Sequence, residues 1–165
     1  MNNHNLNLLD ALQIAMQAEQ KAAELYADAA QKTANPLGQR LFEQLADFER
    51  HHYTKLSDLA ESLRDDGAFI EYEGKDIQYP VPGEVKSIEE ADKMSAMAVI
   101  TMAIDVEREA EQRYTTLARQ TTDPAGQSMF QRLAEEEHTH YLILDHTYWN
   151  LNNRGTWEGT WEGAN

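Results

Sequence analysis

Six residues in the chain have the types and the spacing needed to bind a pair of metal ions. Each half of the sequence contains one glutamate followed thirty residues later by a Glu-x-x-His motif: Glu19 with Glu49 and His52, and Glu107 with Glu137 and His140. Together the two sets supply four carboxylates and two imidazoles. This is the ligand set of a carboxylate-bridged two-metal centre inside a four-helix bundle.

An internal repeat relates the two sets. A shift of 88 residues places residues 15–56 on residues 103–144, with identical amino acids at 16 of the 42 positions. Two Glu-x-x-His motifs overlap in the second half, and the same shift selects the one ending at His140 over the one ending at His138. The histidines outside the ligand set are expected to face solvent, namely His4, His51, His138 and His146.

The ligand residues interrupt stripes of leucine that would otherwise form a core. In the second helical segment, one inward-facing stripe runs through Leu45, Glu49, His52 and Leu56. A buried ionised carboxylate destabilises a fold by several kcal/mol unless something compensates its charge. No basic residue lies on these stripes, so the choice is between bound metal and a polar interior satisfied by hydrogen bonds. Carboxylate and imidazole ligands suit iron and manganese, and zinc could occupy such a site as a substitute.

Two tyrosines accompany the glutamates that precede the motifs. Tyr26 and Tyr114 follow Glu19 and Glu107 by seven residues and therefore lie on the same helix faces. One interpretation is that both rings only pack in the core. The other is that each phenol forms a hydrogen bond with a ligand glutamate, which makes both tyrosines candidate catalytic residues.

Four segments with helical periodicity carry these residues: about 6–32, 36–64, 87–120 and 124–150. Asn35 and Asp123 can each cap a helix that begins with proline. The turns after the first and third segments are tight, so the helices form two antiparallel pairs. The long connection over residues 65–86 fits one crossover along a bundle.

The sequence therefore predicts an all-α protein: a ferritin-like four-helix bundle with one long crossover between helices 2 and 3 and an internal two-fold repeat. The bundle occupies residues 1–150. Residues 151–165 are expected to form an irregular tail, whose Trp157 and Trp161 either pack loosely on the bundle or contact a second subunit.

Composition excludes several classes of protein. The chain has 165 residues and no cysteine, which excludes disulfides, thiolate metal sites and iron–sulfur clusters. A net charge of −15 opposes binding to nucleic acid or to an anionic membrane surface. No apolar stretch reaches the ~18–20 residues of a membrane-spanning helix and no secretory signal is visible, which favours the cytoplasm.

The chain resembles the rubrerythrin branch of the ferritin-like superfamily of di-iron carboxylate proteins from Leu6 to about Asn150. The resemblance rests on four motifs: Glu19-x6-Tyr26, Leu45-Ala-x-x-Glu49-x-x-His52, Glu107-x6-Tyr114 and Leu133-Ala-x-x-Glu137-x-x-His140. It implies that the Glu-x-x-His glutamates bridge two irons, that the earlier glutamates are terminal ligands, and that each histidine binds one iron. It also implies reduction of hydrogen peroxide, or oxidation of ferrous iron by oxygen or peroxide.

Two departures from rubrerythrins affect the expected activity. Rubrerythrins carry a further glutamate three residues after the third-helix ligand, where this chain has Ala110. Their rubredoxin-like domain needs four cysteines, which this sequence lacks, so turnover would require an external electron donor. The ligand set is closer to the centre of bacterioferritin, although the tail from Leu151 does not resemble the fifth helix of cage-forming ferritins.

These features lead to one principal expectation and two alternatives. The principal one is a di-iron oxidoreductase of peroxidase or ferroxidase type that acts on peroxide or dioxygen and assembles as a homodimer. The first alternative is an iron storage or delivery protein with a ferroxidase centre. The second is a non-catalytic metal-binding helical bundle.

Overall fold

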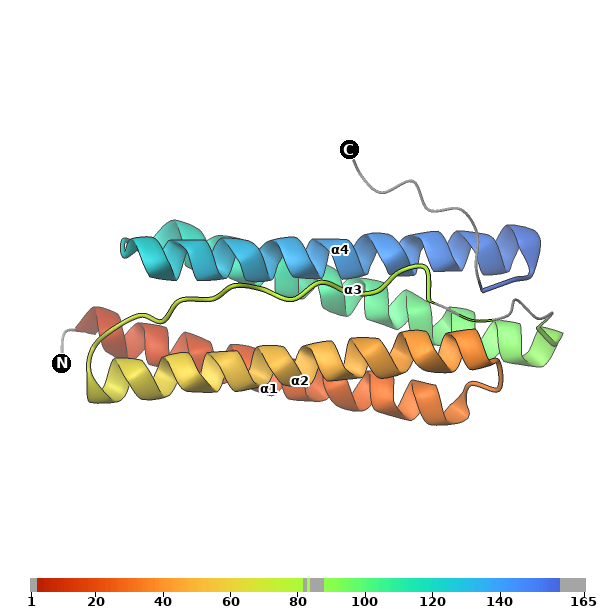
Figure 1. The fold of residues 1–165 in the computed structure, drawn as a ribbon, viewed down its shortest axis with the longest axis horizontal. Helices are drawn as coiled ribbons and strands as arrows, with labels where there is room; N and C mark the ends of the chain where they lie inside the picture. Colours follow the sequence, from red (N-terminus) through yellow and green to blue (C-terminus); the bar gives the residue numbers. More distant parts are fainter. Residues whose placement is uncertain (1–2, 82, 84–87, 158–165) are drawn as a thin grey trace.

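The structure is a computed structural model that describes residues 3–81, 83 and 88–157, with side chains from residue 7 onward. These residues contain four helices and no strand: α1 (Asn3–Lys32), α2 (Pro36–Asp65), α3 (Glu90–Gln120) and α4 (Pro124–Arg154). Figure 1 shows two antiparallel hairpins, α1 with α2 and α3 with α4, which confirms the predicted four-helix bundle. No described helix is long and apolar enough to cross a membrane.

Short-range signals in the sequence set the starts of α2 and α4. The Asn35 side chain accepts a hydrogen bond from the backbone N–H of Leu37 (3.0 Å), and Asp123 accepts one from that of Gly126 (3.1 Å). A proline follows each cap, where its missing N–H costs no helical hydrogen bond. Both predicted caps are therefore confirmed.

The other helix ends differ in part from the prediction. Helix α3 begins at Glu90, and the predicted start at Ser87 lies outside the described residues. Helix α4 continues past residue 150 to Arg154, where Gly155 ends it with φ 64°. Glycine adopts this left-handed conformation without a steric penalty. The helix therefore ends before Gly155 and not at Asn150, where the sequence analysis placed its end.

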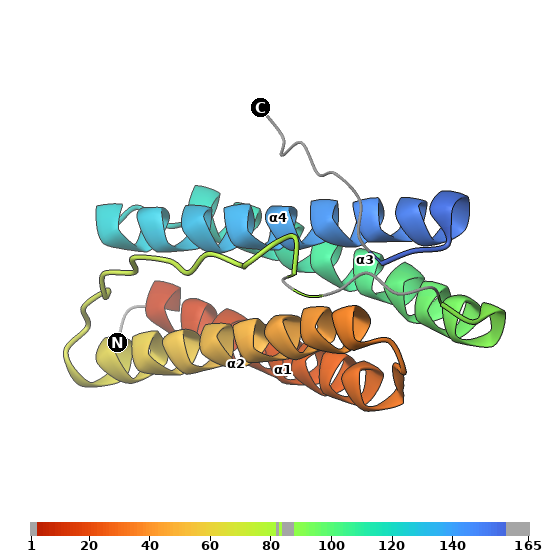
Figure 2. The same cartoon turned by 45° about the vertical axis from the view of Figure 1, so that its right-hand side comes forward.

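The connection between α2 and α3 runs along the length of the bundle. Figures 1 and 2 both show its described part running lengthwise between α2 and α4, from the end of α2 towards the opposite end of the bundle. The Gln44 side chain of α2 exchanges two hydrogen bonds with the backbone of Gln78 (3.1 and 3.2 Å). On the other side, Arg132 of α4 pairs with Asp76 (2.8 Å). The predicted single crossover is observed and is attached to both helices.

Two apolar clusters fill the bundle, one towards each end. In α2, Leu45 belongs to the first cluster and Leu56 to the second, and both are fully buried. Each such leucine stabilises the fold by roughly 1.5–3 kcal/mol relative to an exposed one. Glu49 and His52 lie between them on the same helix and are also buried, so a polar layer separates the two clusters.

Residues 155–157, which follow α4, bring Trp157 onto α2. Trp157 is 2% exposed, and its ring meets that of Phe42 edge-on at 5.8 Å. A side chain at Gly38 would collide with the Trp157 ring, so glycine is needed for this close approach. The sequence argument for a subunit contact assumed an exposed tryptophan. It does not apply to Trp157, and Trp161 lies outside the described residues.

Candidate metal centre

The four helices bring six buried polar side chains together at mid-length. They are Glu19 from α1, Glu49 and His52 from α2, Glu107 from α3, and Glu137 and His140 from α4, and none is more than 2% exposed. All six predicted ligands therefore lie in one cluster. The competing motif does not enter it, because Glu135 and His138 are exposed on α4.

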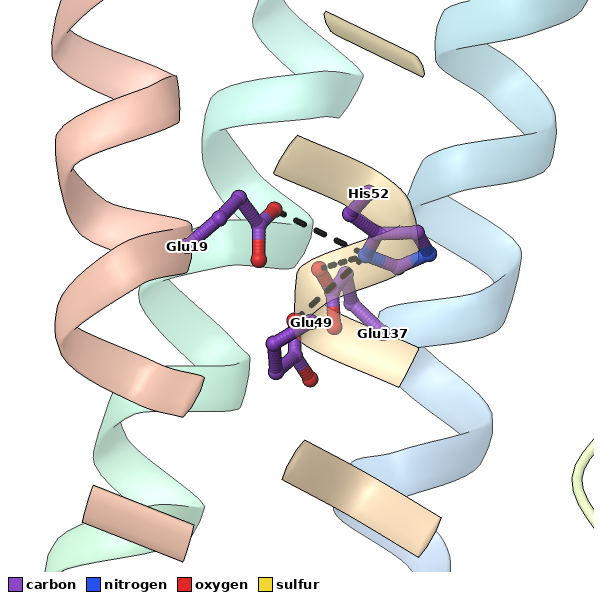
Figure 3. Close-up of side chains that lie close together, drawn as sticks. All are labelled: Glu19, Glu49, His52 and Glu137. Carbon is purple, nitrogen blue, oxygen red and sulfur yellow. Dashed lines mark hydrogen bonds and ion pairs between the residues drawn. The ribbon is translucent and has the colours of Figure 1, made fainter. Parts of the chain in front are cut away.

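The cluster consists of two overlapping groups of ligand atoms. One atom from each member lies within 4.8 Å of the others in each group: Glu19, Glu49, His52 and Glu137 in the first, and Glu49, Glu107, Glu137 and His140 in the second. Figure 3 shows the first group, in which His52 faces three carboxylates from three other positions in the bundle. Glu49 and Glu137 belong to both groups, as residues that bridge two metal ions would.

Each shared glutamate presents one oxygen to each histidine. The Nδ1 atom of His52 is 3.4 Å from Glu49 Oε2 and 3.0 Å from Glu137 Oε1. The Nδ1 atom of His140 is 3.4 Å from Glu49 Oε1 and 3.3 Å from Glu137 Oε2. Since a bridging carboxylate binds one metal through each oxygen, this arrangement suits two metal ions that share Glu49 and Glu137.

Each tyrosine forms a hydrogen bond with the terminal glutamate of the opposite hairpin. Tyr26 on α1 donates to Glu107 on α3, and Tyr114 on α3 donates to Glu19 on α1. Both rings are fully buried and belong to the two apolar clusters. The two interpretations of these tyrosines thus hold together: the rings pack in the core and the hydroxyls orient ligand carboxylates.

Burial and repulsion from nearby carboxylates raise the pKa values of the two shared glutamates. Burial, followed by repulsion from Glu19 and Glu107, raises the pKa of Glu137 to about 8. Burial and then the charge of Glu137 raise the pKa of Glu49 well above its ordinary value. Close carboxylates in a buried site cannot all carry a full charge, because nothing solvates them.

The terminal glutamates and the histidines stabilise each other's charged forms. Burial alone would raise the pKa of Glu19, but hydrogen bonds with Glu49 and His52, and the charge of His52, lower it to about 2. Burial opposes the charged form of His52, yet the surrounding carboxylates, Glu137 foremost, raise its pKa well above the ordinary value. The pKa of His140 is raised for the same reason. Protons on the shared glutamates and the histidines therefore reduce the negative charge that metal cations would otherwise neutralise.

Three of the atoms that face the site have no hydrogen-bond partner in the described part of the chain. They are Glu49 Oε1, Glu137 Oε2 and His140 Nδ1, all of them buried. An unsatisfied buried polar group destabilises a protein by about 1–3 kcal/mol. Metal ions bound in the two groups would satisfy all three, and the nitrogen and oxygen donors fit iron or manganese.

Part of the sequence is similar to a known protein family. Residues 2–60, which contain Glu19, Glu49 and His52, match the family model for rubrerythrin. Over these residues the chain is similar to rubrerythrin. A solved structure of a hypothetical protein from Pyrococcus furiosus superposes with a TM-score of 0.71 at 25% sequence identity, over 93% of each chain. No curated protein matches the sequence.

Glu136 is a buried carboxylate beside the metal site that sequence analysis did not identify. It is 4% exposed, and its Oε2 lies 3.4 Å from Nε2 of His52. It accepts hydrogen bonds from the Tyr72 hydroxyl (2.7 Å) and the backbone N–H of Lys75 (2.5 Å). Burial alone would raise the pKa of Glu136, but its contacts with His52, Tyr72 and Lys75 lower it.

The other histidines follow the expectation only in part. His138 is exposed and pairs with Glu111 at 3.1 Å, as expected of a surface residue. His51 and His146 are half-buried, so the prediction that they face solvent is wrong. The crossover covers both, with Tyr72 and Tyr79 each 6.1 Å away between ring centres. The side chain of His4 lies outside the described residues.

A cleft between α1 and α3 reaches the site from the side opposite the crossover. It has a volume of about 480 Å³, and three of the buried carboxylates line it: Glu19, Glu49 and Glu107. Its walls include the small residues Ala22 and Ala110. Because Ala110 has a small side chain, the cleft is wider there than a glutamate at this position would leave it.

Proposed function

We propose that this chain is a di-iron oxidoreductase of rubrerythrin type that reduces hydrogen peroxide or dioxygen while two bound ferrous ions are oxidised. One observation carries the proposal: the two ligand groups share Glu49 and Glu137, each with one oxygen towards either histidine. A site for a single metal ion would not need the second set of ligands.

The ligands divide naturally between two ions. Glu19 and His52 would hold one, Glu107 and His140 the other, and the shared glutamates would bridge them. Four ionised carboxylates balance two divalent cations, which removes the repulsion that keeps protons on Glu49 and Glu137. The two ferrous ions, when bound, would supply the two electrons that convert hydrogen peroxide and two protons into two water molecules.

The protein contributes fixed geometry and restricted access. Tyr26 and Tyr114 hold the terminal carboxylates in place through their hydroxyl groups. The apolar clusters on either side exclude water from the site along the bundle axis. The α1/α3 cleft leaves an entrance for a molecule as small as peroxide or dioxygen.

Turnover would need a partner that returns electrons to the site. The chain has no cysteine with which to form a rubredoxin-type iron centre, so we propose an external electron donor. We also propose that the chain works as a homodimer in the cytoplasm.

The test is rapid mixing of anaerobic ferrous protein with hydrogen peroxide. We expect about two irons per chain and oxidation by peroxide much faster than that of free ferrous ion. A Glu49→Ala/Glu137→Ala variant should bind almost no iron. The matched control is Asp47→Ala/Glu135→Ala. It removes one exposed acid two residues before Glu49 and one two residues before Glu137.

Two results would refute the proposal. Oxidation no faster than that of free ferrous ion would remove the catalytic role. A large hollow multimer, detected by light scattering, together with storage of many irons per chain would instead indicate the storage alternative.

A further inference from the structure

The two halves of the metal centre differ behind their histidines. The 88-residue shift gives every ligand an identical counterpart, but it pairs Glu136 with Phe48. Each of these two residues directly precedes a shared glutamate. Both are buried, at 4% and 2% exposure. One half of the site therefore has a carboxylate where the other half has an aromatic ring.

On the His52 side, the carboxylate is held rigidly. Glu136 Oε2 lies 3.4 Å from His52 Nε2, the imidazole nitrogen that faces away from the ligand carboxylates. Tyr72 and the backbone of Lys75 fix Glu136 from the crossover, and Arg132 Nε lies 3.8 Å away. An ionised carboxylate at this place keeps a proton on Nε2, which leaves the Nδ1 lone pair free to bind a metal.

On the His140 side, no carboxylate of the described residues takes the place that Glu136 has beside His52. The Phe48 ring stands nearly perpendicular to the His140 ring, with 4.5 Å between ring centres. Neither His52 Nε2 nor His140 Nε2 has a hydrogen-bond partner among the described residues, but only His52 Nε2 has a carboxylate of these residues within ion-pair distance, namely Glu136 at 3.4 Å. A small pocket of about 180 Å³ opens beside His140 and is lined by Phe48 and Lys75, with Glu136 also in its wall. The tautomer and orientation of His140 are therefore less firmly set than those of His52.

We propose that Glu136 makes the two metal positions unequal, so that the position at Glu19 and His52 binds a divalent ion more tightly than the position at Glu107 and His140. Glu136 is a positioning residue that acts through His52. Partners of this kind typically change metal affinity by about 10–100-fold. The inference rests on the proposed two-metal site but not on its redox chemistry.

The experiment is an anaerobic titration of the metal-free full chain with Co²⁺, followed by absorbance and calorimetry. We expect two binding steps with dissociation constants at least about tenfold apart. His52→Gln should abolish the tighter step, whereas His140→Gln should abolish the weaker one. This pair of variants assigns each step to a position without any measurement of activity.

Glu136→Leu tests the cause of the difference. It should weaken the tighter step by about 10–100-fold and leave the weaker step nearly unchanged, so that the two steps merge. Glu136→Gln retains an oxygen acceptor without the charge and should have a smaller effect. Glu135→Leu, a matched change at the exposed neighbouring position, should leave both steps as in the parent. Circular dichroism of each metal-free variant checks folding, and Glu136→Gln keeps the test valid if Glu136→Leu unfolds.

Several outcomes would overturn the inference. Equal dissociation constants for the two steps in the parent would do so. An equal loss of Co²⁺ affinity at both steps in Glu136→Leu would do so as well. No Co²⁺ binding by the folded parent would overturn the two-metal site as well. Two unequal steps in a protein that does not react with peroxide would support the inference and refute only the proposed activity.

Discussion

Tyr26 on α1 donates a hydrogen bond to Glu107 on α3, and therefore a residue of the first hairpin orients a ligand of the second. Tyr114 returns the same contact to Glu19. The two hairpins are thus joined through the side chains of the site. Assembly of the ligand set and docking of the hairpins are parts of one process, because neither tyrosine finds its partner within its own hairpin.

Replacing Tyr26 by phenylalanine tests this contact. The ring would still fill the core, but Glu107 would lose its donor, so we expect about two irons per chain and slower oxidation by peroxide. The rate of oxidation should fall about tenfold. The free energy of unfolding should fall by roughly 0.5–1.5 kcal/mol. Stopped-flow absorbance and urea unfolding measure the two effects. Tyr53→Phe at the exposed surface of α2 is the control, and a Tyr26→Phe protein with parental kinetics would contradict the role.

Stability of the metal-free protein should depend on pH with a definite sign. The pKa of Glu137 rises from 4.5 to about 8 on folding, so the native state binds more protons than the unfolded state between these values. The free energy of unfolding should therefore fall as the pH rises from about 5 to about 8. The raised pKa values of His52 and His140 act in the same direction above pH 6.5. Glu19, with its pKa lowered to about 2, stabilises the fold above pH 4.5 and loses this effect below it.

Thermal unfolding at several pH values measures this dependence. Bound Zn²⁺ should flatten the fall above pH 5, because the metal replaces the protons held by the glutamates and histidines. Glu137→Gln should also reduce the slope, since the amide cannot ionise. A melting temperature of the metal-free parent that rises between pH 5 and 8 would show that the site does not hold these protons.

Helical periodicity and the repeat made most of the site predictable. Glu49 and His52 lie on the same helix face as Leu45 and Leu56. Because that face packs in the core, helical periodicity predicts that both side chains point inward. The 88-residue shift then chose His140 over His138, and the burial of the two residues agrees with that choice. Local sequence similarly placed Asn35 at a helix start.

Contacts with irregular backbone could not be predicted in this way. The role of Glu136 depends on Tyr72 and the backbone of Lys75, which lie in a crossover without periodicity. In the sequence, Glu136 is one member of a run of three glutamates. The 88-residue shift pairs it with Phe48 and pairs exposed Glu135 with Asp47, but this signal indicates an inward position only and names no partner for Glu136. The burial of Trp157 likewise depends on a chain reversal after Gly155.

The packing of Trp157 predicts that the segment after α4 stabilises the bundle. Trp157→Ala would leave a cavity over Phe42 and Gly38 at the start of α2. Replacing a buried tryptophan by alanine typically destabilises a protein by about 3–5 kcal/mol, and we expect a loss in this range in urea unfolding. Trp149→Ala, at a half-exposed ring on α4, should change stability much less. An unchanged midpoint in Trp157→Ala would show that the segment does not pack on α2 in solution.

The α1/α3 cleft makes a prediction about which oxidants reach the site. Ala110→Leu would place a larger side chain in the cleft beside Glu107 and leave all six ligands in place. We expect iron binding to persist while oxidation by hydrogen peroxide slows at least about tenfold, and the bulkier tert-butyl hydroperoxide should be slowed more. Ala98→Leu, at an exposed position on the same helix, controls for the added bulk. If Ala110→Leu retains two irons and reacts with both oxidants at parental rates, the oxidant enters by another route. The pocket beside His140 under the crossover would then be the next entrance to test, because it reaches the same centre from the opposite side.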